Sequence, residues 1–398
     1  MGYGGRDERN CIYRIVEDAV ILKPLVSILI PAFNAQEWIA DTIRSAIAQT
    51  WGRQEIVVVD DGSTDKTLAI ARQWESDSVR VVTQENQGAA AARNKAFSLS
   101  HGDYVQWLDA DDLLAPDKIE RQMEVMNQCR SKRALASAAW GKFKYRYHKA
   151  KFVQTALWCD LSPTEWLLRR MGQNLYMQTA TWLVSRELTE AAGPWDTRLL
   201  GDDDNEYFCR ILLASDGVRF VPDARVYYRS FGHSSLSYIG LSNEKIEAHW
   251  LSMQSHLRYL QSLEDSERVR AACVRYLQTW LPCFYPQRPD IVRMAEQIAR
   301  DLGGQLEVPR SSWKFAWIRA VLGPEVAKRV QTTLSGLKCS VVKSWDKTLF
   351  RIENRRLATD LVDGESGRPT STWSGDVNTS SRDVPTMAVF RPKARLKN

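Results

Sequence analysis

Two clusters of carboxylates mark the residues of this sequence that could do chemistry. The first is Asp-Asp-Gly-Ser-Thr-Asp at residues 60–65, and the second is Asp-Ala-Asp-Asp at residues 109–112. Carboxylates gathered in one crevice repel each other, so they stay ionised together only with a cation or a donor-rich ligand. Such oxygen ligands suit Mg²⁺ or Mn²⁺, which proteins often hold through one or two carboxylates and substrate phosphates. The clusters therefore predict a site for a divalent cation and a phosphorylated ligand.

A purely structural interpretation competes with this one at the first cluster. Asp, Ser and Thr are preferred in turns and at helix N-caps, so Ser63 or Thr64 is expected to cap a following helix. Capping does not explain why Asp60 and Asp61 occur together at the end of a strand. At the second cluster the structural interpretation is weaker, because several acids after a buried strand are costly without a partner.

The elements that would position these acids alternate between two periodicities. Apolar runs of strand length are separated by patterns of helical spacing, which is typical of an α/β fold with a mostly parallel sheet flanked by helices. The expected strands are 26–30, 56–59, 79–82 and 104–108, and the expected helices are 38–47, 66–74 and 89–99. Ligands bind outside the carboxyl ends of strands in open α/β sheets, so we expect both acid clusters in one crevice.

Five short stretches of the sequence follow each other in a recognisable order. They are VSILIPAFN (26–34), VDDGSTD (59–65), NQG (86–88), ARN (92–94) and LDADD (108–112). Together they resemble family 2 glycosyltransferases with the GT-A fold, a Rossmann-like architecture, and they occur in the family's order and at its spacing, which makes the resemblance specific. It is strong over residues 24–115 and continues less closely to about residue 237.

The resemblance implies a nucleotide-sugar site. The turn after the first strand would pass over the nucleotide base, and Asp61 would accept the ring N–H of uracil or guanine. Asp60 would shape the neighbouring turn. Arg93 matches an arginine near the nucleotide, with a solvated helix position as the alternative. The implied nucleotide-sugar-binding residues are Pro31, Ala32, Phe33, Asn34, Asp60, Asp61, Arg93, Asp109 and Ala110.

The same resemblance makes Asp109-Ala110-Asp111 the DxD motif of the family. Asp111 would bind Mn²⁺ or Mg²⁺, and Asp109 would face the ribose or the donor sugar. The metal would neutralise the charge that develops on the diphosphate as the glycosidic carbon–oxygen bond breaks. His233 matches a histidine that approaches the metal or the diphosphate in some members. Its spacing is looser than usual here, and a packed or surface histidine is equally expected.

The resemblance places the catalytic base in the stretch GDDDNEYFCR at residues 201–210. Counting back from Arg210 puts Asp204 at the base position and Asp203 where the family usually has Glu. This departure and the extra Asp202 leave the register open by one residue. A helix N-terminus favours an ionised carboxylate, which can take the proton of an acceptor hydroxyl. The alternative is an acidic N-cap without a chemical role.

The expected activity is inverting transfer of a sugar from a nucleotide diphosphate, most readily UDP, to a hydroxyl of a glycan or lipid-linked acceptor in cell-surface polysaccharide biosynthesis. Trp195 would wall the acceptor site or pack in the core. Three alternatives stay open: a catalytically inactive binding relative, a sugar-phosphate nucleotidyltransferase and a phospho-receiver domain. A nucleotidyltransferase would need a Gly-rich basic loop where this chain has Pro-Ala-Phe-Asn. A phospho-receiver domain would need a Lys partnered with its phosphoacceptor Asp, and no such Lys is evident. No GxGxxG follows a strand, which disfavours a dinucleotide oxidoreductase.

The C-terminal part of the sequence has a different pattern. Helical spacing replaces the strand signal, with helices expected near 246–260, 269–281 and 290–302 and in parts of 313–358. Residues 305–358 carry a net charge of +7, against +6 for the whole chain, and mix aromatic with basic residues. Such a segment can make peripheral contact with an anionic membrane, or it can form helices with a solvated basic face. Nucleic-acid binding is not expected, since no nucleic-acid module accompanies it.

Length and composition, 398 residues with 44% hydrophobic and 26% charged, are those of a globular protein with more than one domain. The sequence has no apolar run of about 18 residues and no apolar N-terminal segment, so neither a membrane-spanning helix nor a signal peptide is expected. Seven scattered cysteines without a CxxC pair favour the cytoplasm, with the inner membrane face as an option. The expected divisions are an N-terminal lead (1–23), the GT-A domain (24–240), a basic helical accessory region (241–358) and a flexible tail (359–398).

Overall fold

The computed structural model describes residues 23–129, 131, 133–230, 242–308 and 340–353. The predicted tail, nearly all of the predicted lead and His233 lie outside this part of the chain. The predicted domain boundaries therefore stay predictions.

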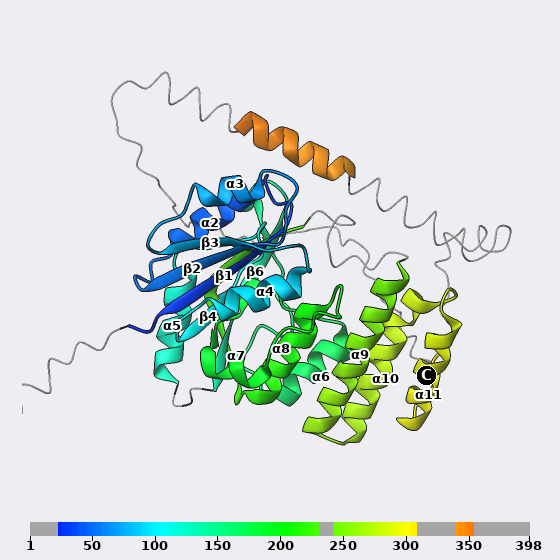
Figure 1. Ribbon diagram of the computed structural model, residues 1–398. Helices are drawn as coiled ribbons and strands as arrows, with labels where there is room; N and C mark the ends of the chain where they lie inside the picture. Colours follow the sequence, from blue (N-terminus) through cyan, green and yellow to red (C-terminus); the bar gives the residue numbers. More distant parts are fainter. Residues whose placement is uncertain (1–22, 130, 132, 231–241, 309–339, 354–398) are drawn as a thin grey trace, which may run out of the picture.

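A five-stranded sheet carries both acid clusters and has the strand order β3-β2-β1-β4-β8 (Figure 1). The first four of these strands in the sequence, β1 to β4, are parallel, and the edge strand β8 is antiparallel to β4. Their bounds are β1 Val26–Ala32, β2 Gln54–Asp60, β3 Val79–Thr83, β4 Tyr104–Trp107 and β8 Val184–Ser185. The four predicted strands and the mostly parallel sheet are thus confirmed. β1 is buried along its whole length, as its apolar run requires in a sheet covered on both faces.

A second, four-stranded sheet has the order β5-β9-β6-β7 and is built around the long parallel pair β6 and β9. Its strands are β5 Leu113–Leu114, β6 Ala134–Phe143, β7 Lys151–Phe152 and β9 Gly217–Arg229. The sequence pattern does not predict β6, because its ALASAAWGKF stretch is rich in alanine, a residue with low strand propensity. Pairing with β9 and burial decide its conformation, since all but one of its residues are buried.

Helices lie on both sides of the first sheet, with α2 and α3 on one side and α4 on the other (Figure 1). The predicted helices α2, α3 and α4 are confirmed. The helices before the C-terminal region are α2 Ile39–Ile47, α3 Thr67–Arg72, α4 Ala89–Ser98, α5 Lys118–Gln128, α6 Pro163–Gln173, α7 Arg186–Ala192 and α8 Asp203–Ala214, with the short 3-10 helices η1 Tyr147–Lys149 and η2 Thr179–Thr181.

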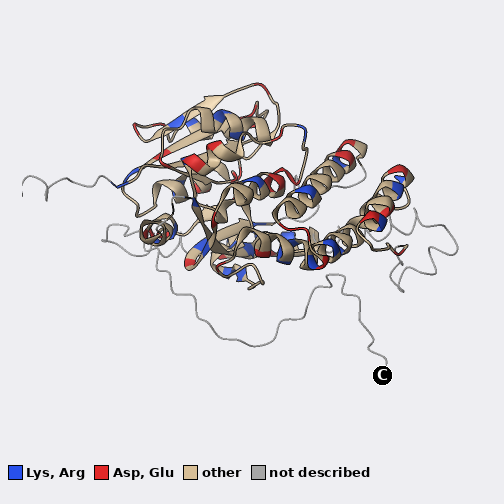
Figure 2. Ribbon diagram, turned by 90° about the horizontal axis from the view of Figure 1, so that it is seen from below, with Lys and Arg blue, Asp and Glu red and all other residues tan. Residues whose placement is uncertain are grey.

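Three long helices follow and pack side by side next to α6 and α8 (Figure 1). They are α9 Asn243–Leu263, α10 Glu267–Phe284 and α11 Pro289–Asp301, and residues 340–353 form a further helix. Residues 242–308 contain eight Lys or Arg and nine Asp or Glu, so the predicted positive charge lies C-terminal to α9–α11. Figure 2 shows both signs of charge intermixed along these helices. Among the described residues, no helix has the length and apolar character needed to cross a membrane.

Candidate active site

The turn after β1 is tied to the loop after β2. Asn34, at a left-handed φ of 49°, donates its backbone N–H to Ser63 Oγ at 3.0 Å. Pro31 and Ala32 are still part of β1 and are buried, so the turn itself begins at Phe33, whose side chain is 46% exposed. Of the four residues predicted to pass over a nucleotide base, the last two are thus the ones that leave the sheet.

The predicted helix cap by Ser63 or Thr64 is wrong. Thr64 instead donates its backbone N–H to Asn34 Oδ1 at 2.9 Å. Asp65 takes the capping role, because its Oδ1 accepts the backbone N–H of Thr67, the first residue of α3, at 2.9 Å. Ser63 and Thr64 instead join the loop after β2 to the turn after β1.

Asp61 is 2% exposed, and its carboxylate accepts hydrogen bonds from the loop at residues 84–88. The donors are the Gln84 side-chain amide and the backbone N–H groups of Gln87 and Gly88, at 2.8, 3.0 and 2.8 Å. A carboxylate has about four lone-pair positions, so one is left for a ligand N–H. Contact between Asp61 and a nucleotide base stays a prediction.

Asp60, which is 1% exposed, links the ends of β2 and β3 by accepting the Thr83 hydroxyl at 3.0 Å. Next in the chain, Gly62 has a φ of +70°, and a Cβ there would lie 2.8 Å from the backbone nitrogen of Asn86. Only glycine fits this backbone without strain. Close packing of the two loops therefore requires a glycine after Asp60 and Asp61.

Arg93 joins the second acid cluster to the third. Its guanidinium donates to Asp109 Oδ1 at 2.8 Å and to Asp203 Oδ2 at 2.6 Å. Although burial lowers the pKa of Arg93, the charges of Asp203 and Asp109 raise it overall. Arg93 is only 6% exposed, so the alternative of a solvated helix position is wrong. The end of β4 and the start of α8 are held together by this one side chain.

Trp195 packs beneath Arg93 and belongs to the core. The guanidinium lies 4.4 Å from the Trp195 ring centroid, and Trp195 stacks on Tyr207 at 4.0 Å on its other side. The backbone of Trp195 is fixed by both groups of the Asn94 amide, at 2.8 and 2.9 Å. With 2% of its surface exposed, Trp195 supports the arginine and is not an exposed wall of the site.

Asp111 and Asp112 have different surroundings. Asp112 is fully buried and accepts the Arg229 backbone N–H at 2.7 Å and the Gln178 side-chain amide. Among the described residues, no side chain donates a hydrogen bond to the Asp111 carboxylate. Burial and the neighbouring charge of Asp109 raise the pKa of Asp111 to about 6. Asp112 therefore braces the fold, whereas the Asp111 carboxylate is influenced by the charges of Asp109 and Arg229.

The pair Asp109 and Asp111 fits a divalent cation of the Mg²⁺ or Mn²⁺ type. A cation between them would remove the repulsion that raises the pKa of Asp111. No group of three or more His, Cys, Asp or Glu side chains in the described part of the chain is arranged to hold a metal. Binding of Mg²⁺ or Mn²⁺ by Asp109 and Asp111 therefore stays a prediction.

The three acids before and at the start of α8 have different surroundings, although Asn205 donates to both Asp202 and Asp204. Asp202, at a left-handed φ of 61°, accepts Ser252 Oγ at 2.7 Å, and Asp203 pairs with Arg93. Asp204 accepts the backbone N–H of Asn205 at 2.8 Å, and burial together with the charges of Asp203 and Asp202 raises its pKa to about 7. No ion pair involves Asp204 among the described residues, although the nearby charge of Arg93 opposes the rise of its pKa. The register of the catalytic base stays a prediction.

Helix α9 braces this acidic turn, and sequence reasoning missed the residues that do so. Besides Ser252, His249 Nδ1 lies 3.6 Å from Asp202 Oδ2, and the Tyr259 hydroxyl donates to Glu206 at 2.7 Å. The sequence does contain a sign of this role, because Ser252 and His249 interrupt the apolar face of an otherwise amphipathic helix. Polar residues on a buried face need partners, but the sequence does not say which ones.

Comparisons with known proteins relate this chain to glycosyltransferases. Residues 27–190 match the family described as glycosyl transferase family 2. The chain is 29% identical over 320 residues to an uncharacterized glycosyltransferase of Rickettsia bellii, covering 75% of this chain and 44% of that protein. It is 46% identical over 107 residues to the putative teichuronic acid biosynthesis glycosyltransferase TuaG of Bacillus subtilis (26% and 42%), and 42% identical over 108 residues to chondroitin synthase of Escherichia coli (26% and 16%). The chain spans less than half the length of each of these relatives.

A solved structure supports the fold. S. aureus TarS residues 1–349, determined in complex with UDP-GlcNAc, has a TM-score of 0.51 and 18% sequence identity to this chain. The likeness covers 70% of this chain and 92% of the TarS chain, and it agrees with a GT-A-like α/β fold followed by helices. The part of the chain at residues 27–190, which contains Asp109, Asp111 and Arg93, therefore belongs to glycosyltransferase family 2.

Proposed function

We propose that this protein transfers a sugar from a UDP-sugar to a hydroxyl of a glycan or lipid-linked acceptor, with inversion at the anomeric carbon. The observation that carries the proposal is the bridge from Asp109 through Arg93 to Asp203, which brings the DxD motif next to Asp204. The UDP-GlcNAc bound to TarS supports a UDP-sugar donor. The names of TuaG and chondroitin synthase support a role in polysaccharide biosynthesis.

In the proposed reaction, the acceptor oxygen forms a bond to the anomeric carbon from the side opposite the leaving group. The bond from that carbon to the diphosphate oxygen breaks, and its electron pair leaves with UDP. The acceptor proton passes to Asp204, whose pKa of about 7 leaves much of it ionised at neutral pH. Arg93 holds Asp203 and Asp109 in place, so the repulsion between the acids does not displace the base.

The donor would lie along the carboxyl ends of β1, β2 and β4. Phe33, Asn34 and Asp61 would contact the nucleoside, and Asp109 and Asp111 would hold Mn²⁺ or Mg²⁺. When bound, this cation supplies positive charge for the leaving diphosphate. His233 remains a predicted further ligand, and it lies outside the described residues.

Thermal unfolding with UDP, GDP, dTDP, CMP and ADP, each with and without Mn²⁺, tests the donor site. Stabilisation follows RT ln(1 + [L]/Kd), about 2.7 kcal/mol at a hundredfold excess over Kd. We expect a Mn²⁺-dependent shift with UDP that Asp111→Asn abolishes. The control is Asp160→Asn, which changes an exposed acid paired with Arg219 and keeps the shift. A shift that is absent with every nucleotide, or unchanged in Asp111→Asn, contradicts the proposal.

Donor binding alone would also fit an inactive relative. Release of UDP from UDP-GlcNAc and UDP-glucose, with water or added glycans as acceptor, separates the two. Turnover that depends on Asp204 supports the transferase, whereas tight UDP binding without turnover of any donor favours the binding protein.

A further inference from the structure

The helix at residues 340–353 is docked on the family 2 domain through its acidic side. Arg146, which follows β6, donates to Asp346 at 2.9 Å and to Glu353 at 2.7 Å. The Tyr145 backbone N–H donates to Asp346 at 3.0 Å, and the Tyr145 and Phe350 rings lie 6.0 Å apart. The Arg146–Asp346 side chains are only 16% and 18% exposed, so this contact is partly buried.

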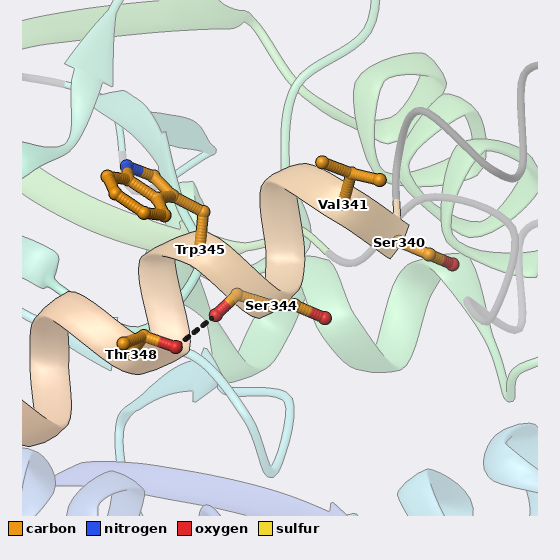
Figure 3. A pocket seen from close by; sticks show the side chains of 5 residues that line it. All are labelled: Ser340, Val341, Ser344, Trp345 and Thr348. Carbon is orange, nitrogen blue, oxygen red and sulfur yellow. Dashed lines mark hydrogen bonds between the residues drawn. The ribbon is translucent and has the colours of Figure 1, made fainter.

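The opposite side of this helix is apolar and exposed. Val341 is 70% exposed, Trp345 66% and Ile352 43%. Spacings of four and seven residues put the three on one helix face, and that face is turned away from Asp346 and Phe350. Figure 3 shows Val341 and Trp345 projecting from the same side of the helix, beside Thr348 and Ser344. With Ser340, these residues line a surface pocket of about 410 Å³.

The acidic and basic side chains of the helix lie on different sides of it. Both of its acids, Asp346 and Glu353, are bound to Arg146 on the docked side. Its cations, at positions 343, 347 and 351, repeat every four residues and therefore form one row between the docked side and the apolar side. Lys347 reaches Glu37 at 3.5 Å, and Arg351 is exposed. The outward surface thus combines an apolar stripe with a cationic edge.

We propose that this outward surface, made by Val341, Trp345 and Ile352 with Arg351 at its edge, binds a membrane that contains anionic lipids. Aliphatic and Trp side chains enter the interface between headgroups and acyl chains, and Lys and Arg attract anionic headgroups. The helix is about 21 Å long, too short to span a bilayer core of about 30 Å, so it lies in the interface.

A second copy of the chain is a less suitable occupant. A two-fold dimer through this surface would bring two equivalent cationic rows together, and these rows would repel each other. An anionic lipid surface would attract the same row. The net charge of +7 over residues 305–358 has the same sign and strengthens the attraction to anionic lipid. Binding to the membrane does not depend on the proposed sugar transfer and can be measured without it.

The docked helix is close to the proposed metal site. The Tyr145 ring that packs on the helix also packs on Trp38 at 5.4 Å, and Trp38 carries the Arg229 guanidinium at 4.1 Å. Arg229 in turn donates to the Asp111 carbonyl at 2.7 Å. A membrane on the outer side of the helix would therefore hold the donor site near the surface where a lipid-linked acceptor resides, a consequence that rests on the proposed function.

Co-sedimentation of the full chain with vesicles tests the proposal. We expect binding to phosphatidylcholine vesicles that contain phosphatidylglycerol, little binding to phosphatidylcholine alone, and weakening by salt. The triple variant Val341→Ser, Trp345→Ser, Ile352→Ser should lose at least tenfold in affinity for the mixed vesicles, and Arg351→Glu should lose severalfold. The matched control is Val153→Ser, Met294→Ser, Val308→Ser, which changes side chains that are 69%, 42% and 59% exposed elsewhere.

The UDP-induced thermal shift of each variant reports whether its family 2 domain is still folded and occupied. Equal binding to both kinds of vesicle, or full binding by the triple variant, overturns the proposal. Absence of vesicle binding together with a dimer that the triple variant dissociates, seen by sedimentation equilibrium, replaces the membrane with a second copy. Vesicle binding without any nucleotide shift would leave this inference standing while contradicting the proposed function.

Discussion

Asp204 is the side chain on which the proposed chemistry depends most directly. In Asp204→Asn the shape is kept but the proton acceptor is lost, so kcat should fall by about 10²- to 10⁴-fold with little change in UDP affinity. The wild-type rate should rise with pH around 7, where Asp204 loses its proton, and the residual rate of the variant should not. UDP release measured across pH tests both, with Asp196→Asn, an acid paired with Arg198, as control. Activity within about threefold of wild type would exclude Asp204 as the base.

The raised pKa of Asp204 also has a consequence for stability. The folded protein holds the Asp204 proton up to pH about 7, whereas the unfolded chain releases it near 3.8. Protonated Asp204 therefore contributes fully to the free energy of unfolding below pH 3.8, the pKa in the unfolded chain. This contribution is lost as the pH rises to about 7, the pKa in the folded protein. Thermal unfolding without metal should show Asp204→Asn becoming more stable than wild type between pH 4 and pH 8. A constant difference across this range would contradict the pKa.

Arg93 is the second decisive residue, because it compensates two carboxylates at once. Arg93→Gln leaves Asp109 and Asp203 without their cation, which should cost about 3–5 kcal/mol of the free energy of unfolding. Arg219→Gln is the control, since its pair with Asp160 is about half exposed and should be worth less than about 1 kcal/mol. Urea denaturation measures both. Equal losses would mean that the Arg93 bridge contributes no more than a surface ion pair.

At the scale of elements, α9 acts as the support of α8. Ser252 on α9 donates to Asp202, and Ser252→Ala should cost about 1.5–3 kcal/mol because a buried carboxylate loses a donor. If this contact positions the turn before Asp204, kcat falls while the Kd for UDP stays unchanged. Ser262→Ala on the same helix, whose exposed hydroxyl bonds the Tyr259 carbonyl, is the control. A loss of stability with unchanged kcat would make the contact structural only.

The packing of α9 also gives part of the accessory region a role in supporting the site. Its sequence pattern predicts helices, and α9, α10 and α11 confirm them. The pattern does not show that α9 contacts the turn that carries the proposed base. Residues 243–263 therefore form part of the site's support, although the domain boundary near residue 240 is still a prediction.

At the scale of the whole molecule, the helix at 340–353 is held by contacts some 200 residues away in the chain. Arg146→Ala removes both ion pairs and should release the helix, raising the initial rate of tryptic cleavage within it about tenfold, which corresponds to about 1.4 kcal/mol. Arg121→Ala, which breaks a partly exposed pair with Asp117 at the start of α5, should leave the cleavage rate within residues 340–353 unchanged. Unchanged cleavage in Arg146→Ala would show that apolar contacts alone hold the helix.

The parallel core, the strand ends that carry the acids and the family motifs could all be predicted from the sequence. These features are local: a buried parallel strand needs an unbroken apolar run, and the turns after it require particular residues such as Gly62. Helix periodicity is equally local, which is why α9, α10 and α11 could be predicted. Strand β6 could not, because its alanines have no strand preference and only its neighbours bury it.

The partners of the charged side chains were decided only by the tertiary structure. Arg93 binds Asp203 across 110 residues, and Ser252 binds Asp202 across 50. The sequence offers many acids to each arginine, and charge alone does not distinguish between them. Each donor pairs with the acid that the packed sheet and helices bring within hydrogen-bond distance and shield from water. The different environments of Asp202, Asp203 and Asp204 therefore arise only in the packed tertiary structure.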